Sequence, residues 1–402
     1  FRSGKMPRDC LRRKDVKLFL RKRHMILIFG ALLAVYVFCR AILPLKLKWG
    51  WKLLLAALLA VAAFKFHLLH LFGGPMFFSP VLPENVLLAA AWLFSVLFLF
   101  FFLLLAADVV RALYLLVLFC LRRNRTERFR IIGNRVNVAL LVFSAVLATV
   151  GMIGGTRVPQ VKEETVAVNR LPEEADGLTV AVLADLHVDG ITREERIRKI
   201  VERTNALNPD IVVIAGDFVD GTVPVHGGDL RPLADLKARY GVFGVPGNHE
   251  YYSGYEEWME FLPTLGIRML LNEHAPAGGE AVVLAGVTDP VAGIMGKEEP
   301  DISKALKDAP EKGVRILVSH QPRLAREAAA HGVDLQVSGH THGGMIAGVD
   351  RLVACFNEGF VSGLYTVGNM KLYVSNGAGI WNGFPIRIGV PSEIVLIRLR
   401  KE

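Results

Sequence analysis

The chain has 402 residues, of which 52% are hydrophobic, and its mean hydropathy is +0.39. This length accommodates two or three domains, and this hydropathy excludes an ordinary soluble protein. Residues 1–155 carry 22 Lys and Arg against 5 Asp and Glu, a net +17, whereas residues 156–402 carry 25 against 33, a net −8. A basic excess on an apolar half is typical of the cytoplasmic ends of membrane helices, and the acidic second half excludes a nucleic-acid partner.

The first 24 residues form a basic tail with ten Lys and Arg. The chain starts at Phe1, which is not an initiator residue, while Met25 stands where the first apolar run starts. We therefore predict that residues 1–24 are an upstream extension or a non-native segment. A native tail would favour the cytoplasm, and the membrane topology could then invert.

Residues 25–154 contain four apolar runs, each near the roughly 20 residues that a membrane-spanning helix requires. They cover about residues 25–43, 52–72, 86–106 and 136–154. The sequence therefore predicts an all-α bundle of about four transmembrane helices. A helix over 86–120 would be about 50 Å long, beyond the ~30 Å hydrocarbon core, so its end should protrude into water. A fifth, short span is the alternative.

The Lys and Arg residues between the runs predict the topology. Loop 40–52 has four of them, loop 73–85 has none, and segment 108–135 has seven. The positive-inside rule places the first and third connections in the cytoplasm. We expect a multi-pass protein of the cell membrane whose residues after 154 are extracytoplasmic. Residues 155–177, rich in Glu, Pro and Val, are predicted to be a linker.

Residues 178–400 have the pattern of a layered α/β domain. Amphipathic segments such as "REERIRKIVERTNAL" have apolar residues at helical spacing, and they alternate with short apolar runs. The alternation predicts strands and helices in layers. The predicted strands are "LTVAVLADLH", "DIVVIAGD", "YGVFGVPGNH", "AVVLAGV", "VRILVSH", "VDLQVSGHTH" and "EIVLIRLR".

Five of these strands end in Asp, Asn or His. The clusters are Asp185-Leu186-His187, Gly216-Asp217-Phe218-Val219-Asp220, Gly247-Asn248-His249-Glu250, Ser319-His320 and Gly339-His340-Thr341-His342. Ligands of α/β sheets bind beyond the carboxyl ends of strands, so these side chains should converge. Imidazoles and carboxylates without thiolates suit Mn, Fe, Zn or a mixed pair. The ligands suffice for two divalent metal ions, an arrangement used for phosphoester cleavage.

In order and in type, the five clusters resemble those of the calcineurin-like metallophosphoesterases, over about residues 176–400. The resemblance implies a four-layer αββα sandwich with a dinuclear metal site. It implies that Asp217 bridges the metals, that His249 is a non-ligand acid and that Asp220 holds its imidazole. The implied ligands are Asp185, His187, Asp217 and His342 for the first metal, and Asp217, Asn248, His320 and His340 for the second.

The segments "SHQP", "VSGHTHGGM" and "YVSNGAGIWNGFPIRIGVPSEIVLIRLR" resemble a membrane-associated subgroup with several N-terminal spans. That subgroup usually has Gln at the position of Met345. Because this position lies outside the metal clusters, we expect altered substrate contacts rather than lost activity.

The expected function is a membrane-anchored phosphoesterase that hydrolyses its substrate with metal-activated water. An anchored enzyme works near the bilayer, so a lipid-linked or amphipathic phosphoester and membrane lipids are the expected partners. One alternative is a UDP-diacylglucosamine-type pyrophosphatase of lipid A synthesis, which needs a cytoplasmic site. Another is a transporter or sensor that the soluble half regulates, and a third is a metal-holding scaffold. The ligand set does not choose among Mn, Fe and Zn, and the oligomeric state stays open.

Overall fold

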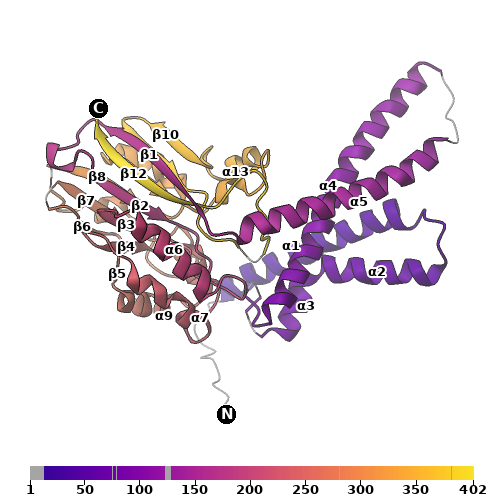
Figure 1. Cartoon of the computed structure of the whole chain (residues 1–402), viewed down its shortest axis with the longest axis horizontal. Coiled ribbons are helices and arrows are strands. Elements are labelled where there is room, and N and C mark those ends of the chain that lie inside the picture. Colours follow the sequence, from indigo (N-terminus) through magenta and orange to yellow (C-terminus); the bar gives the residue numbers. More distant parts are fainter. Residues whose placement is uncertain are drawn as a thin grey trace, which may run out of the picture. The chain divides into compact units, whose positions relative to one another are not determined.

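The structure is a computed structural model that describes residues 13–402 except Pro75, Phe78, residues 123–127, Glu280, Glu311 and Asn382. The chain divides into two compact units, Phe1–Val150 and Gly151–Glu402. The first half of the predicted basic tail, residues 1–12, lies outside the described residues. The described elements of the first unit are all helices, whereas the second unit combines strands and helices (Figure 1).

The helices of the first unit are α1 (Arg13–Val37), the π-helical turn η1 (Phe38–Ile42), α2 (Trp49–Ala63), α3 (Lys65–Phe72), α4 (Glu84–Cys120) and α5 (Arg128–Thr156). Three stretches of the described helices are long and apolar enough to cross a membrane, namely Arg23–Ile42, Glu84–Cys120 and Gly133–Thr156. The pair α2 and α3 adds a fourth if it forms one span. Large apolar side chains such as Val110 and Phe119 are exposed, which suits a lipid environment.

The second predicted span, residues 52–72, is not one straight helix. α2 and α3 meet at Phe64 with a bend of 74°. Phe64 has φ −103° and ψ 20°, outside the helical region. The sequence did not predict the bend, because there is no Pro or Gly at this position. By contrast, α4 is continuous over 37 residues through the predicted third span and its extension to Cys120.

The second unit contains two six-stranded sheets. The first has the order β1 (Gln160–Val168), β12 (Glu393–Lys401), β2 (Thr179–Leu183), β3 (Ile211–Ala215), β4 (Val242–Val245) and β5 (Ile267–Met269). The second has the order β10 (Gly363–Val367), β11 (Met370–Val374), β9 (Leu335–Ser338), β8 (Val314–Val318), β7 (Val282–Gly286) and β6 (Glu273–Pro276). Strands β2 to β5 are parallel, as are β7, β8, β9 and β11.

Short helices connect these strands. They are α6 (Glu194–Ala206), α7 (Val223–Leu230), α8 (Asn248–Tyr252), α9 (Tyr255–Phe261), α10 (Val291–Ile294), α11 (Ile302–Ala305), α12 (Ala325–Ala330) and α13 (Asp350–Phe356). The 3-10 turns are η2 (Glu173–Ala175), η3 (Arg231–Asp235), η4 (Leu262–Leu265), η5 (Pro322–Leu324) and η6 (His342–Gly344).

The apolar strands are buried on both faces, because each sheet packs against the other sheet on one face and against helices on the other. Val182 of β2 shares a buried cluster with Ile316 of β8, so the two sheets pack face to face. Leu183, the next residue of β2, points the other way and packs with Ile200 of α6. On the outer face of the second sheet, Leu317 packs against α12. The predicted αββα sandwich is confirmed.

The middle of the predicted linker, residues 155–177, forms strand β1. This strand pairs in parallel with β12, from Gln160 opposite Glu393 to Val168 opposite Lys401 (Figure 1). Its sequence, "QVKEETVAV", has charged residues in the centre, as is typical of an edge strand. Because of these charged residues, the segment lacks the apolar run from which the other strands were predicted.

Candidate active site

Five loops at the carboxyl ends of five strands carry all nine predicted site residues. The loops after β2, β3 and β4 belong to the first sheet, and those after β8 and β9 belong to the second. Contacts of 4.0 Å or less connect the nine side chains into one cluster. Its members are Asp185, His187, Asp217, Asp220, Asn248, His249, His320, His340 and His342. The two sheets therefore contribute to one site.

The backbone of this site is strained. A left-handed conformation is uncommon for residues other than glycine and costs about 1–3 kcal/mol each. Hydrogen bonds between the loops hold it, since the N–H of Asp185 donates to the carbonyl of Gly216 and that of His187 to the carbonyl of Asp217, both at 3.0 Å. The strained residues, with φ from 47° to 72°, are Asp185, His187, Asp217, His340 and His342.

The first group of candidate ligands joins Asp185, His187 and His342, all buried. Nε2 of His187 lies 3.1 Å from Nε2 of His342. Nε2 of His342 lies 3.7 Å from Oδ1 of Asp185. Two facing imidazole nitrogens beside a carboxylate offer converging lone pairs, which is the donor arrangement that a divalent cation requires.

The second group joins Asp217, Asn248, His320 and His340. Nε2 of His320 lies 3.2 Å from Oδ2 of Asp217 and 3.2 Å from Oδ1 of Asn248. Nδ1 of His340 lies 3.2 Å from the same nitrogen. Because Nδ1 of His320 donates to the carbonyl of Ala215 at 2.8 Å, its Nε2 is the nitrogen that would bind a cation, once the cation displaces the Nε2 proton.

Asp217 lies between the two groups. Its Oδ2 is 3.6 Å from Nε2 of His187 and 3.2 Å from Nε2 of His320. Burial raises the pKa of Asp217, but the neighbouring imidazoles of His320 and His249 outweigh it and hold the pKa well below its usual value. An ionised carboxylate with this placement can bridge two cations. The imidazole, carboxylate and amide donors therefore fit two divalent metal ions.

Asp220 holds two imidazoles. Nδ1 of His249 donates to its Oδ1, and Nδ1 of His187 lies 3.1 Å from its Oδ2. The family resemblance implied the contact with His249, but not the contact with His187. Burial lowers the pKa of His249, but the carboxylates of Asp220 and Asp217 outweigh it and raise the pKa to about 9.

His249 is close to the metal ligands yet partly open. Its Nε2 lies 4.0 Å from Oδ2 of Asp217, and its side chain is 18% exposed. By distance, His187, Asp217 and His249 could also share an ion. The partly exposed side chain allows a second role, contact with a bound substrate.

Glu250 organises two of the loops, although the sequence analysis assigned it no role. Its fully buried carboxylate accepts four backbone N–H groups, from Gly247 at 2.6 Å, Phe218 at 2.8 Å, Asp217 at 3.1 Å and Val219 at 3.3 Å. Burial raises the pKa of Glu250 to about 7. The signal in the sequence was a Glu three residues after Gly247, the spacing of a helix-capping side chain.

Glu250→Ala should destabilise the second unit by about 3 kcal/mol or more, because it leaves four buried N–H groups without acceptors. The thermal unfolding midpoint of the purified chain should fall by roughly 6 °C or more. Glu250→Gln keeps one acceptor oxygen and should lose less. An unchanged midpoint for Glu250→Ala would contradict this role.

Arg387 is a second residue that the sequence analysis missed. Its buried guanidinium donates to the carbonyls of Asn376 at 2.7 Å, Gly379 at 2.9 Å and His342 at 3.2 Å. It thereby ties the segment after β11 to the loop that carries a candidate ligand. The sequence contained a signal for this role, because Arg387 is the single charged residue between Ser375 and Ser392.

Comparison with known proteins identifies the family. The profile described as "Calcineurin-like phosphoesterase" matches residues 178–344. An uncharacterised metallophosphoesterase from Campylobacter jejuni is 31% identical over 395 residues, covering 95% of this chain and 99% of its own. The chain belongs to the calcineurin-like metallophosphoesterase family. The resemblance predicted from the five strand ends is confirmed.

Two further metallophosphoesterases extend the comparison. A bovine "Transmembrane protein with metallophosphoesterase domain" is 31% identical, covering 87% of this chain and 80% of its own. An uncharacterised metallophosphoesterase from Helicobacter pylori is 40% identical over 251 residues, which is 62% of this chain and 66% of its own. The match thus spans about two thirds of the Helicobacter protein. The bovine name and the apolar helices of this chain both indicate membrane association.

Proposed function

We propose that this metallophosphoesterase is a membrane-anchored hydrolase that cleaves phosphoester bonds with two divalent cations, Mn, Fe or Zn. The observation that carries the proposal is the position of Asp217 Oδ2 between the imidazoles of His187 and His320. When bound, the cations would polarise the phosphoryl oxygens and lower the pKa of water. One cation would be held by Asp185, His187, Asp217 and His342, and the other by Asp217, Asn248, His320 and His340.

His249 would supply the proton for the leaving oxygen. Its pKa, raised to about 9, keeps the imidazole protonated at neutral pH, and its side chain is 18% exposed. Asp220 accepts the hydrogen of Nδ1, which fixes the orientation of the ring and stabilises its charged form. The cleaved P–O bond leaves its electron pair on the departing oxygen, and the proton from Nε2 neutralises it.

Metal removal tests the proposal directly. The purified full-length chain should contain about two equivalents of divalent metal by elemental analysis. It should lose turnover on chelation and regain it on addition of Mn. A screen of phosphomonoesters, phosphodiesters and lipid diphosphates would identify the substrate class. Undiminished turnover by metal-free protein would overturn the proposal.

Gly247→Ala should impair the site without any change in its donor groups. A Cβ at Gly247 would lie 2.2 Å from Oδ1 of Asp217 and 2.5 Å from its backbone nitrogen, so the bridging residue must move. A displacement of about 1 Å can cost on the order of 10²-fold in turnover. The matched control is Gly228→Ala in α7, where a Cβ meets nothing within 4 Å. Equal turnover of the two variants would contradict the close approach.

The membrane helices provide the anchor in this proposal. Four spans, with basic residues in the first and third connections, would place the second unit on the extracytoplasmic side. An amphipathic phosphoester in the bilayer surface would then be the substrate class within reach. A reporter fused after Glu402 tests the orientation. A cytoplasmic signal would instead favour the UDP-diacylglucosamine-type pyrophosphatase reaction.

A further inference from the structure

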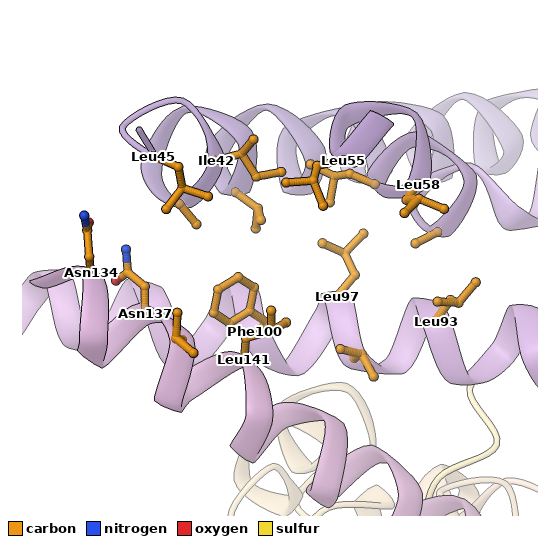
Figure 2. Close-up of a pocket in the computed structure, with 16 residues that line it drawn as sticks. Ile42, Leu45, Leu55, Leu58, Leu93, Leu97, Phe100, Asn134, Asn137 and Leu141 are labelled. Atoms are coloured by element: carbon orange, nitrogen blue, oxygen red, sulfur yellow. The ribbon is translucent and has the colours of Figure 1, made fainter. Parts of the chain in front are cut away.

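The helix α13 has an exposed apolar face, although it belongs to the second unit and not to a candidate span. Val349, Leu352 and Phe356 share one face by helical spacing and are 36%, 61% and 70% exposed. In the first unit, apolar side chains such as Leu58 and Leu93 line a groove of about 380 Å³ between apolar helices, which a bilayer explains (Figure 2). The apolar face of α13 lies outside those helices and therefore indicates a separate contact.

Both ends of α13 lie beside loops of the candidate active site. Its first turn lies against η6, since a Cβ on Gly344 would lie 2.9 Å from Cα of Asp350. At the other end, the carbonyl of Phe356 accepts a hydrogen bond from Nη2 of Arg323 at 3.2 Å. Arg323 belongs to η5, which follows the candidate ligand His320. The loops after β8 and β9, which carry candidate ligands, therefore contact the two ends of this helix.

The end of α5 packs within the same unit. Residues 151–156 belong to the second unit and complete the candidate span that α5 provides. A Cβ on Gly151 would lie 2.9 Å from Cγ1 of Ile388, so glycine allows a close approach there. The N–H of Arg387 donates to the carbonyl of Gly151 at 2.9 Å. The segment around Arg387 and Ile388 is therefore fixed to the last turns of a candidate membrane helix.

The same segment is paired with the residues that lead into α13. The N–H of Ile388 donates to the carbonyl of Met345 at 2.9 Å, and its carbonyl accepts from the N–H of Ala347 at 2.8 Å. The span of α5 has 24 residues, about 36 Å at 1.5 Å per residue, whereas the hydrocarbon core is ~30 Å thick. Its last turn therefore ends at the bilayer surface, and the backbone pairs bring the segment before α13 to that surface.

We propose that α13 docks on the bilayer that α5 crosses, with Leu352 and Phe356 inserted among the lipid acyl chains. A helix with an apolar face docks in this way about 5–10 Å into the boundary between headgroups and acyl chains. A phosphoester in the same bilayer would then reach the metal-binding loops beside α13 without leaving the lipid. The inference rests on the membrane anchor of the proposed function and is independent of its catalytic chemistry.

Fluorescence of the full-length chain in lipid vesicles tests the docking. The exposed Cys355 of α13 carries an environment-sensitive fluorophore, and the other cysteines are replaced by Ser. We expect lipid brominated on the upper acyl chain to quench this fluorophore in phosphatidylcholine vesicles. The matched control moves the thiol to η2 with Cys355→Ser and Glu174→Cys. Glu174 is exposed and follows the far end of β1, a strand about 30 Å long that starts soon after α5 ends, so its label should escape quenching.

Variants of the apolar face provide the second test. Leu352→Asp combined with Phe356→Asp should abolish the quenching, because two carboxylates would have to enter the acyl region. Leu352→Met combined with Phe356→Leu keeps the face apolar and should preserve the quenching. Since both side chains are mostly exposed, neither pair of substitutions should change the thermal unfolding midpoint.

The inference is overturned if the label on Cys355 is quenched no more than the label of the Glu174→Cys control. It is also overturned if the two Asp substitutions leave the quenching unchanged. A label that is shielded from iodide in water yet not quenched by brominated lipid would overturn it too, because a second protein would then cover the face. Turnover is not measured, so failure of the proposed function would be seen separately.

Discussion

Asp217→Asn is expected to reduce turnover of a chromogenic phosphodiester with Mn by on the order of 10³-fold or more. The amide keeps the shape of the side chain but removes the charge that both ligand groups share. Its NH₂ group would also face an imidazole nitrogen of His187 or His320, which now lie 3.6 Å and 3.2 Å from Oδ2. The bound metal per chain should fall too. Initial rates and elemental analysis of the same preparation measure both effects.

The matched control for this variant is Asp235→Asn. Asp235 is exposed on η3, away from the nine site residues, so the same chemical change should leave turnover and metal content as in wild type. Undiminished turnover by Asp217→Asn would refute the assignment of this carboxylate as the bridge between two cations.

His249→Gln is expected to slow hydrolysis of alkyl phosphoesters by about 10²–10⁴-fold, the usual contribution of a general acid. Esters of p-nitrophenol should be affected much less, because p-nitrophenolate leaves without a proton. The reason is structural, since Asp220 holds Nδ1 of His249 and leaves Nε2 free to donate. Turnover across a series of leaving groups of increasing pKa should fall more steeply for the variant than for wild type.

The metal content of the His249→Gln variant distinguishes a general acid from a metal ligand. His249→Gln should retain its metal, although His187, Asp217 and His249 are close enough to share an ion. The exposed His331, whose Nδ1 contacts the carbonyl of Glu327, provides the control His331→Gln. Loss of metal from His249→Gln, with equal slowing of all esters, would make His249 a ligand instead.

The central strands of both sheets were predictable from the sequence, and the outer strands were not. Runs such as "DIVVIAGD" are buried on both faces and therefore consist almost entirely of apolar residues. Strands β1, β5, β6, β10 and β11 lacked this signal, since they are short or lie at or near the sheet edges with mixed burial. The layer order came from the family resemblance rather than from periodicity.

The nine site residues were also predictable, because each follows an apolar strand in a polar cluster. The contacts that these residues make with distant parts of the chain were not predictable. Asp220 reaches His187 across 33 positions of the chain, and Arg387 reaches the carbonyl of His342 across 45. Glu250 binds N–H groups more than 30 residues away. Contacts over such separations depend on how the loops lie in space.

The amino-acid sequence alone determined an apolar, basic membrane half and a second half whose buried strands end in metal-binding side chains. Local periodicity and residue type suffice for that, because hydrophobic burial acts along each element. Only the tertiary structure decided that three loops come from one sheet and two from the other. It also decided that Asp217 faces both ligand groups and that the segment before α13 pairs with Ile388 beside the end of α5. These features depend on long-range pairing and on left-handed backbone turns held by hydrogen bonds between loops. Local sequence patterns therefore do not predict them.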